Sequence, residues 1–164
     1  MSDTTAPLSG GLLARAGGLY ARLGEALDRW AGPPVELAAR VWLGLIFFKA
    51  GLTRVNAWDS QAFLFDSIHP VPFLPAEIAA VVTTAGELLL PVLLWLGLAQ
   101  RLAALGLFAM TATIQFVVAQ TPEGMENRIG HPEHYAWMLG FLLLAVRRPS
   151  ILTLDHWLCG RQRG

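Results

Sequence analysis

The stretch "TTAGELLLPVLLW", residues 83–95, places a carboxylate and a proline inside an apolar run. An ionised group is expensive near the middle of a bilayer and normally faces the protein interior. Pro91 lacks the N–H that would bond the carbonyl of residue 87, so Glu87 combines a carboxylate with a freed backbone carbonyl. The stretch therefore predicts a helix with an inward-facing polar site.

The rest of the chain is also strongly apolar. Of its 164 residues 54% are hydrophobic and 15% are charged, against about 25% charged in ordinary domains. Four apolar stretches, 35–54, 77–98, 101–120 and 132–148, have lengths close to the about 20 residues that a helix needs to cross a bilayer. We therefore predict an all-α membrane protein, a four-transmembrane-helix bundle over residues 35–148. A re-entrant fourth segment is the alternative, because its uninterrupted apolar run covers only residues 135–146.

Basic residues gather on one side of the predicted spans. Arginines precede the first span, follow the second and follow the fourth, whereas the connections 55–76 and 121–131 carry several acidic residues. Lysine and arginine accumulate in cytoplasmic loops. This predicts a multi-pass protein of the bacterial inner (cytoplasmic) membrane with both termini, including a tail over 149–164, in the cytoplasm. The net charge of zero gives no indication of a nucleic-acid partner.

Residues 1–34 are predicted to form a polar N-terminus and an amphipathic helix. Apolar residues from Leu12 to Trp30 recur at helical spacing, and Arg15, Arg22 and Arg29 recur every seven residues on another face. An apolar face beside a basic stripe favours a helix on the anionic inner leaflet. Packing on the bundle or on a partner subunit is the alternative. "AGPP", residues 31–34, is predicted to break this helix before the first span begins.

The candidate intramembrane polar site draws on three spans. Its members are Arg40, Thr83, Thr84, Glu87, Pro91 and Gln115. We predict that Glu87 pairs with Arg40, which shares its helix face with two glycines, and that Thr83 or Thr84 supplies hydroxyl donors. Such a pair can lock helix packing, form a quinone, proton or substrate site, or contact a partner subunit. A protonated Glu87 bonded to a hydroxyl is a further alternative.

Metal and thiol chemistry find little support in the sequence. His69, His131 and His134 lie in the predicted outer connections or beside them and are weak candidates for copper or zinc ligands. We predict no confident metal site. Cys159 is the single cysteine of the chain, so neither an intrachain disulfide nor a dithiol pair can form.

Together these residues resemble the DoxX family of small bacterial inner-membrane proteins, over about residues 40–158. Besides Glu87, the residues that carry the resemblance are Arg40, Gly44, Gly51, Arg54, Gly97, Arg101 and Asp155. The resemblance implies a four-helix membrane bundle and redox work, since the family includes a membrane subunit related to thiosulfate:quinone oxidoreductases. A quinone is the cofactor it implies. Residues 47–65, "FFKAGLTRVNAWDSQAFLF", are similar to a subgroup encoded beside genes for copper-responsive modified peptides.

Three functions are consistent with the resemblance and the residues. The first is a DoxX-type accessory membrane subunit of a redox or metal-stress system, which is not an enzyme as an isolated chain. The second is a quinone-linked oxidoreductase subunit whose site is Glu87 with Arg40. The third is a small transporter or channel. The predicted partners are the lipid bilayer and other membrane or membrane-associated proteins, and a homo-oligomer is left open.

Overall fold

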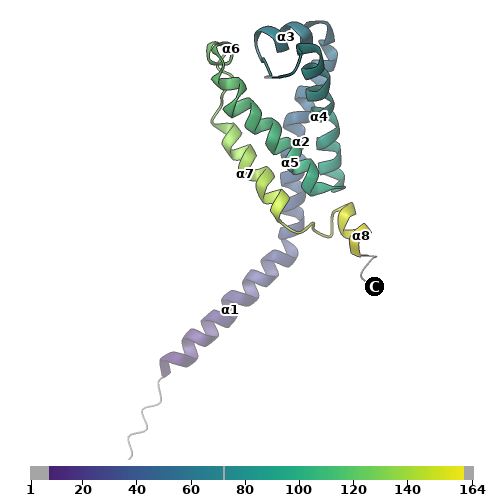
Figure 1. Cartoon of the computed structure of the whole chain (residues 1–164). Coiled ribbons are helices and arrows are strands. Elements are labelled where there is room, and N and C mark those ends of the chain that lie inside the picture. Colours follow the sequence, from purple (N-terminus) through teal and green to yellow (C-terminus); the bar gives the residue numbers. More distant parts are fainter. Residues whose placement is uncertain (1–7, 72, 161–164) are drawn as a thin grey trace, which may run out of the picture.

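The computed structural model describes residues 8–71 and 73–160, with side chains described within 14–71 and 73–158. All regular elements of the described residues are helices and none is a strand, which confirms the all-α prediction. Its elements, in chain order, are α1 (Leu8–Trp30), α2 (Gly32–Asn56), η1 (Trp58–Ser60), α3 (Gln61–Ser67), α4 (Ala76–Leu96), α5 (Gln100–Phe116), η2 (Val118–Gln120), α6 (Pro122–Glu126), α7 (Glu133–Val146) and α8 (Leu154–Gly160). Figure 1 shows α3 and α6 at one end of the bundle, here called the α3 end, and α8 at the other, the α8 end.

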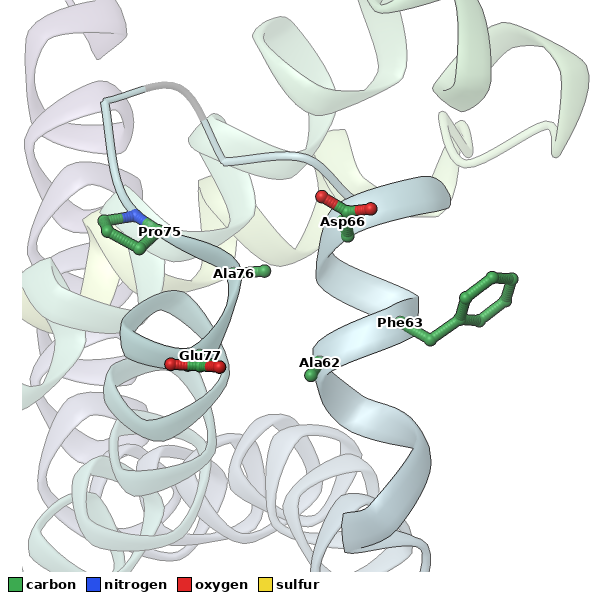
Figure 2. Close-up of a pocket in the computed structure, with 6 residues that line it drawn as sticks. All are labelled: Ala62, Phe63, Asp66, Pro75, Ala76 and Glu77. Atoms are coloured by element: carbon green, nitrogen blue, oxygen red, sulfur yellow. The ribbon is translucent and has the colours of Figure 1, made fainter.

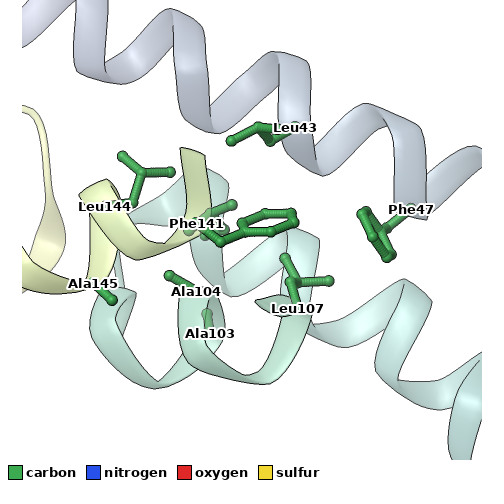
Figure 3. Packing of buried hydrophobic residues seen from close by; sticks show 9 residues of the cluster. Leu43, Phe47, Ala103, Ala104, Leu107, Phe141, Leu144 and Ala145 are labelled. Atoms are coloured by element: carbon green, nitrogen blue, oxygen red, sulfur yellow. The ribbon is translucent and has the colours of Figure 1, made fainter. Parts of the chain in front are cut away.

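The bundle is built from α2, α4, α5 and α7. Helix α2 packs along α4, α4 along α5, and α5 along α7. The main core cluster comprises Leu43, Phe47, Leu94, Ala103, Ala104, Leu107, Phe141, Leu144 and Ala145. Figure 3 shows most of this cluster, with the ring of Phe141 lying between α2 and α5. Phe47 and Phe141 meet edge to face at a centroid distance of 5.5 Å. Burying an aromatic or leucine side chain of this kind contributes about 1.5–3 kcal/mol.

The helix boundaries differ from the predicted ones where prolines act. The N-terminal helix ends before the first span, as predicted, but the break is a single residue: α1 ends at Trp30 and α2 begins at Gly32. The prolines occupy the first positions of α2, where a missing N–H costs nothing. At the other end of the bundle α7 stops at Val146 rather than at residue 148. Arg148 precedes Pro149, and the residue before a proline is disfavoured in helical conformation.

Two helices are long and apolar enough to cross a membrane, Ala76–Leu96 and Gln100–Gln120. Helix α2 is longer but carries four charged residues, and α7 has only 14 residues. Many large apolar side chains nevertheless point outward, among them Leu89 at 64% exposure, Leu102 at 72% and Leu139 at 59%. An exposed apolar surface around a partly polar interior is typical of a bundle surrounded by lipid.

Helix α1 does not pack on the bundle. Figure 1 shows it leading away from the lower end of α2. Its apolar side chains are exposed, with Tyr20 at 81% and Trp30 at 77%. Packing of α1 against its own bundle is therefore wrong, and the apolar face of α1 is uncovered in this structure.

Close contact between α2 and α4 depends on glycine, as the sequence predicted. A Cβ added at Gly44 would overlap Nε1 of Trp95, and one added at Gly51 would lie 2.9 Å from Leu88 Cδ2. These two positions also set the register of the antiparallel pair, because Gly51 faces Glu87 and Leu88 while Gly44 faces Trp95.

We expect the substitution Gly44→Leu to lower the stability of the detergent-solubilised protein by about 1–3 kcal/mol or more, because the side chain must displace Trp95. The matched control is Gly24→Leu in α1, where nothing lies within 4 Å of an added Cβ. Thermal unfolding followed by circular dichroism measures both. Equal midpoints for the two variants would contradict the close helix contact.

Candidate functional site

The connection between α2 and α4 lies at the α3 end of the bundle and packs against α4. This connection, predicted only as an outer loop, contains η1 and α3. Phe65 of α3 packs with Ala79 and Ala80 of α4 in a second buried cluster. The short apolar run at residues 63–65 was the signal for this packing. This connection brings Gln61 of α3 close to the predicted intramembrane site.

Glu87 pairs with Arg54, not with Arg40. Nε of Arg54 donates to Oε2 of Glu87 at 2.8 Å, and the Glu87 side chain is 3% exposed. Arg54 also donates through Nη1 to Oε1 of Gln61 at 3.3 Å, and its guanidinium lies 5.0 Å from the centre of the Phe65 ring. The predicted inward-facing, ion-paired carboxylate is therefore confirmed, and the predicted partner is wrong.

Arg40 lies at the α8 end of the bundle in a site of its own. Its side chain is completely buried. Nη1 donates to the carbonyls of Leu94 and Trp95 at 3.4 Å, and Nη2 donates to the carbonyl of Leu152 at 2.9 Å. Nε lies 3.8 Å from Oε1 of Glu36, one turn earlier in α2. Arg40 thus caps the last turn of α4 and ties down the C-terminal segment.

The other residues of the predicted site lie on α4 and α5 and do not contact the Arg54–Glu87 pair through hydrogen bonds. Thr84 is buried, but its hydroxyl has no hydrogen-bond partner among the described residues, so neither it nor Thr83 donates to Glu87. Pro91 is buried inside α4, which continues through it to Leu96. Thr111 and Gln115 share a buried face of α5.

A pocket of about 350 Å³ opens beside the Arg54–Glu87 pair. Its walls combine two kinds of residue. The polar ones are Arg54, His69, Glu87, Thr111, Asn127, Arg128, His131 and His134, and the apolar ones are Ile46, Phe47, Ala50, Ile114, Ile129 and Trp137. Ligand pockets in proteins usually measure about 300–1,000 Å³ and combine apolar walls with a few convergent polar groups. The pair therefore borders a space that can hold a small molecule.

Gln115 fixes the hydrogen-bonding role of His134 in this pocket. Oε1 of Gln115 accepts from the backbone N–H of His131 at 3.2 Å and lies 2.7 Å from Nδ1 of His134. A backbone N–H only donates, so the amide atom facing it is the oxygen, and Nδ1 of His134 must carry the hydrogen. The same N–H lies 3.5 Å from Nδ1, too far to compete. In neutral His134 the other nitrogen, Nε2, is therefore an acceptor.

The three histidines that were weak metal candidates all line this pocket, but they do not form a metal site. Within the described residues no group of three or more His, Cys, Asp or Glu side chains lies close enough to hold a metal ion. Burial and the positive charge of Arg54 lower the pKa of His69 from its ordinary value. The lowered pKa favours the neutral form of His69 at pH 7.

A hollow of about 470 Å³ lies between α3 and the first turn of α4. Its lining residues are Ala62, Phe63, Asp66, Pro75, Ala76 and Glu77, and Figure 2 shows the Phe63 ring pointing away from it. The hollow contains none of the predicted site residues. Its two carboxylates are exposed and hold no partner within the described residues.

Several residues singled out in the sequence close the α8 end of the bundle. Gly97 adopts a left-handed conformation, with φ of 63°, and ends α4. The carboxylate of Asp155 accepts from the backbone N–H groups of Ala99 and Gln100, both at 2.8 Å, and so caps the first turn of α5. Arg101 is exposed beside this turn. Gly97 and Asp155 thus shape the turn between α4 and α5, and all three residues stand apart from the pocket.

The fold and site together define a class: an all-helical membrane protein with a buried ion pair beside a small polar pocket. The chain belongs to the DoxX family, whose family model, described as DoxX, matches residues 35–120, that is 86 of 164 residues. The match includes Arg40, Arg54 and Glu87 but ends before α7 and Asp155, short of the expected residue 158. No curated protein and no solved structure matches the chain.

Proposed function

We propose that α2, α4, α5 and α7 all cross the bacterial inner membrane, with both termini in the cytoplasm. Two observations support this arrangement. The bundle packs all four helices around one core, and arginines concentrate at the α8 end and in α1. The α3 end, with its acidic connections, then faces outward.

The topology predicts which added cysteines an impermeant thiol reagent reaches. Single cysteines at positions 62 in α3 and 126 in α6, both exposed positions, should react in intact spheroplasts. Native Cys159 should react only after the membrane is opened. Labelling of Cys159 from outside would reverse the proposed orientation.

We propose that α1 lies on the anionic inner surface of the same membrane. Its exposed apolar face, including Leu19, Leu23 and Leu27, and the stripe of Arg15, Arg22 and Arg29 support this placement. Each basic residue near such a surface contributes about 1 kcal/mol. Spin labels along α1 of the reconstituted chain should show lipid contact at Leu23 and water contact at Glu25. Spin–spin coupling between chains in place of that alternation would favour a partner-subunit interface.

We propose that the chain is an accessory membrane subunit of a redox or metal-stress system. The observation that carries this proposal is the Arg54–Glu87 pair, which borders an open pocket instead of being enclosed by core side chains. A pair that served packing alone would not need a space of about 350 Å³ beside it. The chain has one cysteine and no dithiol, so a partner would supply any thiol relay.

A quinone-linked oxidoreductase subunit is the second candidate. The pocket favours it, because a guanidinium and imidazoles beside aromatic walls can bind and orient a carbonyl-bearing ring. The site would then consist of Glu87 with Arg54, since Arg40 lies at the opposite end of the bundle.

Isolation of the protein from its native membrane separates the two candidates. A defined protein partner in fixed stoichiometry, without quinone turnover, supports the accessory role. Co-purified quinone with turnover supports the enzyme. A cellular assay with Glu87→Gln tests the pocket itself: if copper tolerance and sulfur metabolism are unchanged while the variant protein is present at normal levels, the site has no role in either system.

A further inference from the structure

We propose that the pocket binds a neutral molecule with one aromatic ring and a hydroxyl group, a phenol in chemical class. The inference names the ligand class of the same pocket and so rests on the proposed function. It is derived from the size of the pocket, from the free donors and acceptors on its wall, and from its charge.

The size and the walls favour a single flat ring. A cavity of about 150 Å³ is enough to hold benzene, and this pocket measures about 350 Å³. Phe47, Trp137 and His134 form a continuous aromatic wall, with centroid distances of 6.1 Å between Phe47 and Trp137 and 5.0 Å between Trp137 and His134. Aromatic rings pack well against such walls in stacked or edge-to-face geometry.

The polar wall offers a donor and acceptors together. Arg54 uses Nε for Glu87 and Nη1 for Gln61, so its Nη2 has no partner among the described residues. Glu87 accepts through Oε2, and its Oε1 accepts no hydrogen bond from the described chain. His134 adds the acceptor Nε2, because Gln115 holds Nδ1 as the donor. A hydroxyl is the smallest group that can accept from Arg54 and donate to Glu87 or His134 at the same time.

The charge of the pocket favours a neutral ligand. Arg54 and Glu87 neutralise each other, so an anion attracted by the guanidinium is repelled by the adjacent carboxylate, and a cation meets the reverse. Arg128 adds a further charged group to the wall, and it is exposed to water, which screens its charge. His69 is neutral at pH 7 because burial and Arg54 lower its pKa. A charged ligand would thus lose its hydration without gaining a matching counter-charge.

Four matched probes test this class with the full chain in detergent: phenol, anisole, benzoate and benzylammonium. Anisole has the ring and the oxygen acceptor but cannot donate, and the other two carry opposite charges. Ligand-observed NMR, corrected with protein-free micelles, measures their dissociation constants. We expect phenol to bind about ten-fold more tightly than anisole or more, because anisole leaves a buried acceptor unpaired. Benzoate and benzylammonium should bind still more weakly.

A pair of variants locates the binding. Ala50→Leu places a larger side chain in the pocket while leaving both Arg54 and Glu87 in the chain, and should abolish phenol binding. The control Ala109→Leu adds the same side chain at an exposed position of α5 outside the pocket wall, and should leave binding unchanged.

Each other result contradicts the inference. Equal affinity for phenol and anisole would show that the ligand need not donate a hydrogen bond. Tighter binding of benzoate or benzylammonium than of phenol would show that the ligand need not be neutral. Phenol binding retained in Ala50→Leu would show that phenol binds outside this pocket. Absence of measurable phenol binding removes the ligand class. None of these results bears on a defined membrane partner or a cellular phenotype, so the proposed function is tested separately.

Discussion

Glu87→Gln and Arg54→Gln should each destabilise the protein by about 3–5 kcal/mol, the cost of leaving one charge of a buried pair without its partner. The two charges are in direct contact at 2.8 Å, and Glu87 is nearly completely buried. Arg54 is 16% exposed at its side chain, so water in the pocket reduces the loss toward the lower end of that range. Unfolding in detergent with increasing denaturant measures both variants.

The two losses should differ from each other and should not add. A carboxylate left without Arg54 can bind a proton and become neutral, whereas arginine remains charged without Glu87. Glu87→Gln should therefore be the more damaging change. The double variant should lose clearly less than the sum, by about 0.5–3 kcal/mol, because the contacting pair is removed together.

The control for this cycle is Glu77→Gln, an exposed carboxylate in the first turn of the same helix. It should change stability by no more than about 0.5 kcal/mol. Additive losses for Glu87→Gln and Arg54→Gln would mean that the pair contributes nothing as a pair.

The register of α2 against α4 explains why the sequence suggested the wrong partner for Glu87. Arg40 and Arg54 lie on one face of α2, so helical periodicity alone allowed either. In the structure Gly51 faces Glu87. Arg40 comes 11 residues before Gly51 in α2, a separation of about 16 Å along the helix axis at 1.5 Å per residue. That exceeds the reach of an arginine side chain, whereas Arg54 is less than one turn from Gly51.

Other features of the site followed from the sequence to different degrees. The inward carboxylate and the glycine contacts were predictable, because burial of a charge and close helix approach each demand particular residue types. The pocket was not, since His69 and residues 127–131, which lie in the connections between helices, complete its wall. Hydrogen bonds between residues of different helices and loops, such as those that Oε1 of Gln115 accepts from His131 and His134, leave no periodic signal in a sequence.

Arg40 makes a different contact from the predicted pair with Glu87. Its guanidinium reaches the last carbonyls of α4, where the helix dipole favours a positive charge, and the carbonyl of Leu152. Asp155 places a negative charge on the first N–H groups of α5. The C-terminal segment is thus attached to both sides of the α4–α5 turn, and its backbone adds a hydrogen bond from Asp155 N–H to the carbonyl of Gly97 at 2.9 Å.

Arg40→Met should therefore lower stability by about 3–5 kcal/mol, since it keeps most of the side-chain volume but removes the hydrogen bonds to the carbonyls of Trp95 and Leu152 and leaves the buried Glu36 without its neighbour. Arg101→Met, an exposed arginine beside the same turn, is the matched control and should stay within about 0.5 kcal/mol of the native protein. Because Arg40 and Asp155 both hold the C-terminal segment, Arg40→Met combined with Asp155→Ala should lose less than the sum of the single changes. Limited proteolysis should cut near residues 147–152 sooner in either single variant than in the control. If Arg40→Met unfolds at the same denaturant concentration as the native protein and its C-terminal segment still resists proteolysis, Arg40 does not hold α2, α4 and that segment together.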